Sequence, residues 1–92
     1  MRHTCPYFAA FLLREDGREG GPRVGFTVGR AAGKAVLRNR LKRRMREAVR
    51  LRLPSVTGPW AIVFNPRRAA LDAPFDAIGR EVEKLFERCR NS

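Results

Sequence analysis

The sequence has few acidic residues, few cysteines and little histidine. Its 92 residues include nine Asp or Glu against 20 Lys or Arg, a formal net charge of +11, with two cysteines and one histidine. Cys5 and Cys89 stand at opposite ends, so we expect free thiols in a reducing cytoplasm rather than a disulfide framework. His3 has no ligand beside it, and no Cys or His cluster has the spacing of a zinc site. No set of residues here is suited to nucleophilic or acid–base catalysis by the protein alone.

Long apolar runs are also absent. The longest near the start, residues 7–13, is too short to cross a bilayer. No small-residue cleavage site follows it, so it is typical of a strand and not of a signal peptide. The apolar fraction of 43% is sufficient for one small domain. We therefore expect a single cytoplasmic domain over residues 1–92, with residues 1–6 flexible and no membrane partner.

Positive charge is in excess and is concentrated in one segment. Residues 30–52 carry ten Lys or Arg and one acid, Glu47. At 100° per residue, residues 34–52 form an amphipathic helix whose apolar side is spaced for docking on a core. Gly33 is its expected N-cap. The apolar side consists of Leu37, Leu41, Met45, Ala48, Val49 and Leu51.

The opposite side of this helix is cationic. So much like charge opposes compaction and is relieved when a polyanion binds. Arginine outnumbers lysine, which favours bidentate phosphate contacts and stacking on bases, and Asn39 can read a base edge or a 2′-hydroxyl. A DNA-binding regulator would need a recognition helix of mixed polar residues, and a membrane-bound helix would carry Trp or Phe on its apolar side. The cationic side consists of Arg38, Asn39, Lys42, Arg43, Arg46 and Arg50, with Arg40 and Arg44 towards its other edge.

The remaining chain supplies the surface on which this helix docks. Residues 7–14 and 23–28 have the composition of strands and flank a turn-rich segment, so we expect an antiparallel hairpin. Residues 60–64 are continuously apolar, which is typical of a buried central strand.

A second amphipathic helix is expected near the C-terminus. Asp72 is its expected N-cap, with Pro74 in its first turn. The resulting β-β-α-β-α order predicts an α+β fold, a single-layer sheet of about three strands with an Arg-rich helix and a C-terminal helix. The second helix extends to about Cys89, and its apolar positions are Phe75, Ile78, Val82, Leu85 and Phe86.

The run RVGFTVGRAAGKAVLRNRLKRRMREAVR resembles the signature of the bacterial ribonuclease P protein subunit. The resemblance extends over about residues 8–86. It implies a fold like that of a ribosomal-protein domain, with a left-handed crossover around the Arg-rich helix, although the general rule favours a right-handed one. The specific part of the run is Arg38-Asn39-Arg40, then Lys42-Arg43 and Arg46-Glu47, preceded by Arg23, Gly33 and Ala35-Val36.

The resemblance also implies a function. In this family a small basic protein pairs with a catalytic RNA that removes the 5′ leader from precursor tRNA. The catalytic centre is RNA-borne, so no protein residue is expected to be catalytic. Mg²⁺ is expected to be held mainly by the RNA and not by the protein alone, and the protein is expected to be monomeric. A non-enzymatic RNA-binding protein of ribosomal type is the alternative.

Two sets of site residues follow from the charge pattern and the resemblance. Relatives hold the leader in a cleft between the sheet and an N-terminal helix. The sequence starts almost at the first strand, so we expect either that this helix is absent or truncated here and the cleft lacks a wall, or that residues preceding Met1 complete it. The matching leader-binding residues are Phe11, Thr27 and Arg30, where Gly29-Arg30-Ala31 replaces a Ser and two lysines of many relatives. The residues expected to contact the catalytic RNA are Lys34, Arg38, Asn39, Arg40, Lys42, Arg43, Arg46, Arg50 and Arg67.

Overall fold

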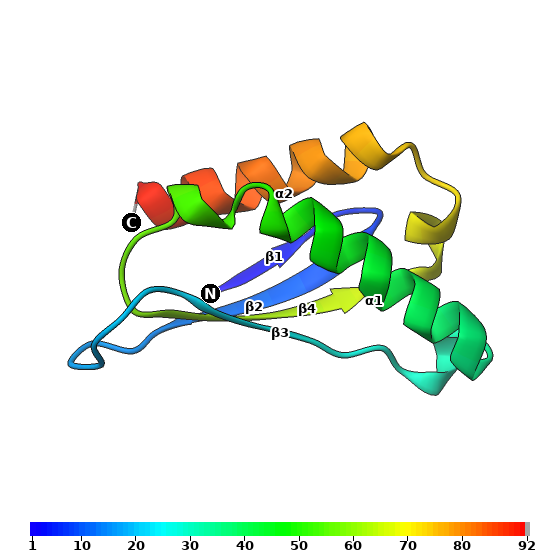
Figure 1. The fold of residues 1–92 in the computed structure, drawn as a ribbon, viewed down its shortest axis with the longest axis horizontal. Coiled ribbons are helices and arrows are strands. Elements are labelled where there is room, and N and C mark those ends of the chain that lie inside the picture. The colour runs from blue at the N-terminus through cyan, green and yellow to red at the C-terminus, as the bar shows by residue number, and fades with distance from the viewer. Residues whose placement is uncertain (92) are drawn as a thin grey trace.

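The computed structural model describes residues 1–91 as one four-stranded sheet with both long helices on the same face (Figure 1). This arrangement confirms the α+β prediction. The strands and helices are β1 (Arg2–Thr4), β2 (Phe8–Arg14), β3 (Arg23–Phe26), α1 (Ala35–Arg50), β4 (Trp60–Pro66) and α2 (Phe75–Arg90), and the short 3₁₀ turns are η1 (Arg30–Ala32), η2 (Leu53–Ser55) and η3 (Arg68–Leu71).

Strand β1 lies within the segment expected to be flexible, residues 1–6. It pairs antiparallel with β2, with Arg2 opposite Phe11. The terminal ammonium of Met1 donates to the Leu12 carbonyl at 2.9 Å. The sheet therefore has four strands and not three, because a three-residue strand is too short to show an alternating pattern and is ordered by its partner.

The sheet order β1-β2-β4-β3 corrects the expected hairpin. Strand β4 lies between β2 and β3, antiparallel to β2 and parallel to β3. Residues 15–22 therefore carry the chain from β2 to the far edge of the sheet. Alternation within a strand reports which side chains are buried but not which strand lies alongside it.

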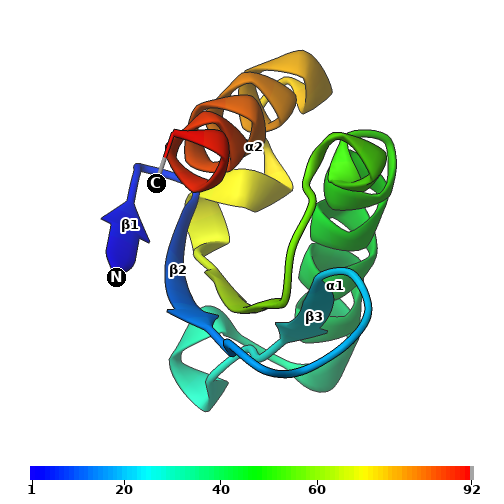
Figure 2. The ribbon, with the colours of Figure 1, turned by 90° about the vertical axis from the view of Figure 1, so that its left-hand side faces the viewer.

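Helix α1 is the crossover that two parallel neighbours require. In Figure 2 the view is along β3 and β4, and both strands run away from the viewer. Strand β3 lies to the right of β4, and α1 lies above the sheet, as Figure 1 also shows. The connection through α1 back to β4 on the left is therefore left-handed. This is the hand that the resemblance implied and the opposite of the general preference. It places α1 above the β3 side of the sheet and α2 above the β2 side.

The core lies between the two helices and the covered face of the sheet. The Phe8 and Phe64 rings meet edge to face at 5.4 Å, and Phe26 stacks on Phe64 at 5.7 Å. The apolar side predicted for α1 is confirmed by the burial of Leu41, Met45, Ala48 and Val49. Two members of the predicted side are exceptions, since Leu37 is only partly buried and Leu51, at the C-cap of α1, is 56% exposed.

The other face of the sheet is open. Phe11, Leu13 and Val63 alternate with core residues along β2 and β4 and are 48%, 64% and 39% exposed. Strand β4 is central in the sheet, as expected, but it is buried on one face only and not on both. An apolar sheet face left in solvent is a candidate binding surface.

The ends of the helices differ by one or two residues from expectation. Lys34, and not Gly33, is the N-cap of α1, and Pro74, and not Asp72, is that of α2. Gly33 has a φ of +126°, and a Cβ there would meet Leu37 Cδ1 at 3.1 Å. Glycine is thus required to turn the chain from η1 into α1.

Candidate nucleic-acid interface

The predicted RNA-binding residues of α1 stand on the side of the helix away from the core. Seven of its 16 residues are Lys or Arg, and one is acidic. No charged or polar side chain of residues 1–91 is classed as buried. The exposed members of the predicted set on this helix are Asn39, Arg40, Arg43, Arg46 and Arg50, and the partly exposed ones are Arg38 and Lys42.

One flank of α1 faces the edge strand β3. Arg38, Lys42 and Arg46 follow one another at four-residue spacing, which places them on one side of a helix. The Arg46 guanidinium lies 5.8 Å above the Phe26 ring of β3. The Nε of Arg38 is buried and has no hydrogen-bond acceptor among the described residues. Arg38 therefore lies closer to the core than its place in the pattern suggested.

The other flank of α1 faces η3 and the start of α2. Here Arg44 donates from Nε to the Ala70 carbonyl at 2.9 Å and from Nη2 to the Ala73 carbonyl at 2.5 Å. Such charge-assisted bonds fix the guanidinium and tie α1 to the chain before α2. Arg44, which the sequence placed at the edge of the cationic side, thus has a structural role in the fold.

Glu47 and Arg50 pair at the C-terminal end of α1. Arg50 donates to both carboxylate oxygens of Glu47. This hydrogen bonding lowers the pKa of the Glu47 carboxyl below its ordinary value and raises the pKa of Arg50. Arg50 is consequently less available to a phosphate than Arg43 or Arg46, although it remains on the exposed side.

Two predicted RNA contacts lie apart from the middle of α1. Lys34 is the exposed N-cap of the helix. Arg67 follows β4 and donates from Nη1 to the Cys5 carbonyl at 3.0 Å. With Arg68 it lines a hollow of about 270 Å³ whose other wall is η1 and the preceding Gly29. Arg67 therefore belongs to the end of the sheet and not to the helix surface.

The predicted leader-binding residues follow the open face towards that same end of the sheet. Phe11 projects from this face opposite Val63. Thr27 directly follows β3, and its N–H donates to the Phe64 carbonyl at 2.9 Å. Arg30 opens η1 and is exposed. All three lie along one route from the open face to the turn before α1.

Several surface residues near these sites were missed from the sequence. The Arg2 guanidinium lies 5.4 Å from the Phe11 ring centre, on a strand that was not expected. Leu13 and Val63 widen the apolar face around Phe11. Leu13 was predictable as part of this face, because it stands two residues after Phe11 on the same strand. Nothing in the sequence placed Arg2 beside Phe11.

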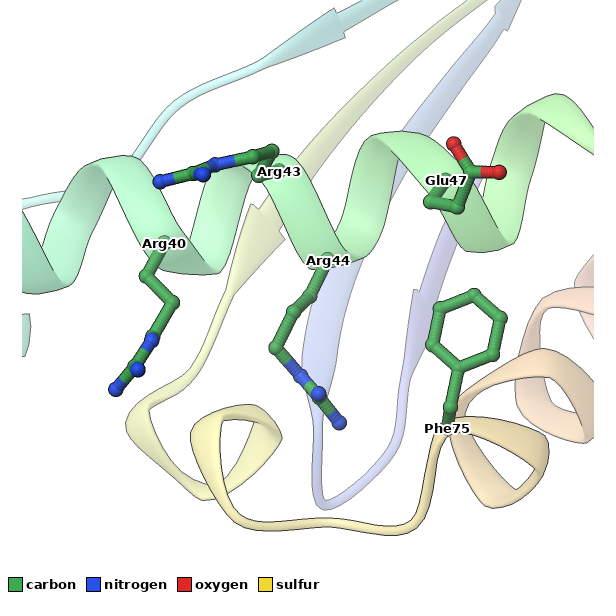
Figure 3. A pocket seen from close by; sticks show the side chains of 5 residues that line it. All are labelled: Arg40, Arg43, Arg44, Glu47 and Phe75. Atoms are coloured by element: carbon green, nitrogen blue, oxygen red, sulfur yellow. The ribbon is translucent and has the colours of Figure 1, made fainter.

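A second hollow, of about 510 Å³, opens between α1 and the start of α2 (Figure 3). This hollow was not predictable from the sequence, because its walls come from segments about 30 residues apart. It is lined by Arg40, Arg43, Arg44, Glu47 and Phe75.

Within residues 1–91, no group of three or more His, Cys, Asp or Glu side chains is arranged to hold a metal ion. None of the helices in this part of the chain is long and apolar enough to span a bilayer.

Comparison with known proteins identifies the family. The family model described as Ribonuclease P matches residues 1–90. The ribonuclease P protein component of Symbiobacterium thermophilum is 59% identical over 43 residues, which are 47% of this chain and 37% of that protein. The matched segment thus spans little more than a third of that relative.

Solved structures agree with this match. The RNase P protein from Thermotoga maritima has a TM-score of 0.81 at 26% identity, over 96% of this chain and 82% of that one. The Staphylococcus aureus RNase P protein has the same fold, with a TM-score of 0.76 at 23% identity over 96% and 79% of the two chains. With the family model covering nearly every residue, the chain belongs to the ribonuclease P protein family.

Proposed function

We propose that this protein binds the catalytic RNA of ribonuclease P through α1 and assists removal of the 5′ leader from precursor tRNA. The observation that carries the proposal is the exposed cationic side of α1, with seven cations and one acid on a helix whose other side packs on the core. Neutralising phosphates with these cations releases condensed counterions, which drives association with structured RNA. The proposed contacts are Lys34, Arg38, Asn39, Arg40, Lys42, Arg43, Arg46, Arg50 and Arg67.

The leader is proposed to lie on the open face of the sheet. A single strand without a fixed sequence is bound well by aromatic platforms beside cations. Phe11 supplies such a platform, with Arg2 above it and the exposed Leu13 alongside. Thr27 and Arg30 continue this surface towards α1, so a strand on this face would end close to the cationic helix.

In this proposal the chemistry belongs to the RNA. Hydrolysis of the phosphodiester bond depends on magnesium ions held mainly by the RNA, and no protein side chain acts as nucleophile or base. The protein contributes charge, since two RNAs brought together repel each other and a chain of net charge +11 lowers that repulsion. It is proposed to act as a monomer in the cytoplasm, to which its free thiols Cys5 and Cys89 are suited.

Reconstitution tests the proposal. The protein is added to ribonuclease P RNA transcribed from the same genome, and cleavage of a precursor tRNA is followed at low magnesium concentration. We expect faster cleavage at the mature 5′ end with the protein than without it. Arg43→Glu with Arg46→Glu should remove the gain, whereas Arg80→Glu with Lys84→Glu on α2 should not. No gain with the unchanged protein would reject the proposed function.

The proposed binding of the leader is tested separately with two precursor tRNAs, one with a leader of several nucleotides and one with a leader of a single nucleotide. Phe11→Ala should weaken binding of the long-leader precursor to the assembled enzyme and leave the short one unaffected. Equal loss for both would place the leader elsewhere.

A further inference from the structure

We propose that the hollow between α1 and α2 receives one unpaired base of the partner RNA, stacked on Phe75 and held by Arg40 and Arg43. The inference rests on the proposed function and adds an aromatic contact from a second helix. The volume of about 510 Å³ lies within the range of small-molecule pockets. In Figure 3 the Phe75 ring rises from the start of α2 towards α1, with the Arg44 side chain beside it.

Phe75 is an exception among the apolar residues of α2. Ile78, Val82 and Leu85 are fully buried, whereas Phe75 is 37% exposed and lines the hollow. An exposed aromatic ring surrounded by cations is suited to base stacking, because every base offers a π-face and the cations hold the adjoining phosphates. The ring therefore fits a nucleotide better than it fits the core.

The hollow is held open by a fixed wall. Arg44 bonds to the carbonyls of Ala70 and Ala73 at 2.9 and 2.5 Å, which sets the chain just before Phe75. The Arg44 guanidinium is thereby less available to bind a phosphate, because its Nε and Nη2 donate to backbone carbonyls. Arg40 and Arg43 on the same side are exposed, and neither side chain donates a hydrogen bond to any residue of the described chain. These two guanidinia are the ones free to clamp phosphates.

Glu47 supplies a preference among bases. It is the one acid of α1 and lines the hollow, with its carboxylate turned away from the Phe75 ring in Figure 3. Both carboxylate oxygens accept from Arg50, and each keeps a further lone pair that a base can use. A carboxylate is repelled by phosphates but accepts hydrogen bonds from the exocyclic amine of cytosine, adenine or guanine. Uracil has no such amine. The base in the hollow is therefore expected to be one of the three that carry it.

The first test compares Phe75→Leu with the unchanged protein on transcribed ribonuclease P RNA. Affinity and chemical probing of the Watson–Crick edges of unpaired bases are both measured. We expect Phe75→Leu to weaken binding by about five- to tenfold, the lower part of the range for loss of one base stack, and to expose one base that the unchanged protein protects. The slope of affinity with salt should not change, because the ring carries no charge.

Three further variants make the test specific. Phe75→Tyr should restore both affinity and protection. Leu51→Ala removes a comparably exposed apolar side chain outside the hollow and should change neither. Replacing the protected base with uracil should weaken binding of the unchanged protein by about fivefold or more, the lower bound for one lost base-specific pair. The same RNA change should weaken binding of the Glu47→Gln variant less, because an amide can pair with uracil.

The outcomes separate this inference from the proposed function. If the unchanged protein binds the RNA and Phe75→Leu binds as tightly with the same bases protected, the hollow is not a base site and the proposed function stands. If the unchanged protein fails to bind the RNA, both are rejected. Folding of each variant is checked by thermal unfolding. If Phe75→Leu unfolds, the proposal is tested with Phe75→Tyr and Glu47→Gln instead. It is overturned if the protein protects no base, or if binding does not discriminate against uracil.

Discussion

Helices α1 and α2 have the same length of 16 residues and dock on the same face of the sheet, but their surfaces differ. Helix α2 carries four cations and four acids. Its charges pair locally, Asp76 with Arg80 at 3.4 Å and Glu81 with Lys84 at 3.2 Å. Helix α1 carries seven cations and one acid, and that acid is paired with Arg50.

The comparison shows that burial does not distinguish a scaffold helix from a binding helix. Both helices bury a continuous apolar stripe. Local pairs of the kind in α2 contribute only about 0.3–0.5 kcal/mol each, but they leave the helix neutral and without affinity for a polyanion. Helix α1 lacks this balance, so its self-repulsion is relieved by phosphates. Charge balance on the exposed side therefore distinguishes α2 from α1, the helix proposed to bind RNA.

The largest effect is expected where the two helices are alike. Met45 of α1 and Leu85 of α2 are both fully buried. Truncation of either to Ala should lower the free energy of unfolding by roughly 2–5 kcal/mol through lost burial and a new cavity. Urea unfolding measures this. A much smaller loss for Met45 would mean that α1 is docked less firmly than α2, which would break the comparison.

The next largest effect is the salt dependence of RNA binding, which concerns α1 alone. If about six of its cations meet phosphates, log K for RNA should fall with log salt at a slope of roughly −4 to −5, a loss of about 300- to 1,000-fold between about 50 and 200 mM salt. Filter binding at several salt concentrations measures the slope. A value near −1 would show that most of the cationic side is unused.

Single substitutions sharpen the contrast. Arg46→Ala should weaken RNA binding by about five- to tenfold and reduce the salt slope by about 1, while Arg80→Ala on α2 should alter neither. Arg38→Ala should also weaken binding without loss of stability, because it removes a buried Nε that has no acceptor in the described chain. Thermal unfolding provides the control. Unfolding of Arg38→Ala would show that its side chain supports the core.

The smallest effect is expected at His3, beside α2, and it concerns the dependence of folding stability on pH. Burial and the nearby Arg88 lower the pKa of His3, which stacks near Phe8. Since the unfolded chain then binds a proton more readily than the folded one, stability is present above pH 6.5 and declines as pH falls below it. Denaturant unfolding between about pH 7.5 and 5.5 measures the decline, in a range above the ordinary carboxyl pKa values. His3→Gln should remove it, and an unchanged decline would assign it to another group.

Most secondary structure was predictable from the sequence because it depends on local patterns. The apolar spacing of residues 37–49 and 78–86 located both helices, and the apolar composition of residues 7–14 and 60–64 located β2 and β4. The cations of α1 and the Arg38-Asn39-Arg40 run were visible in the same way, since an amphipathic helix sorts its own residues onto two sides.

Only the tertiary structure decided which segments lie together. It placed β4 between β2 and β3, made the α1 crossover left-handed, and added β1 with Arg2 over Phe11. It also brought Phe75 to the flank of α1 and committed Arg44 to the carbonyls before α2. A period of 2 or 3.6 residues fixes which side of an element is apolar, but the choice of neighbour depends on contacts between distant residues. By itself the sequence thus determined that this chain presents a cationic helix, and tertiary packing decided what stands beside each cation.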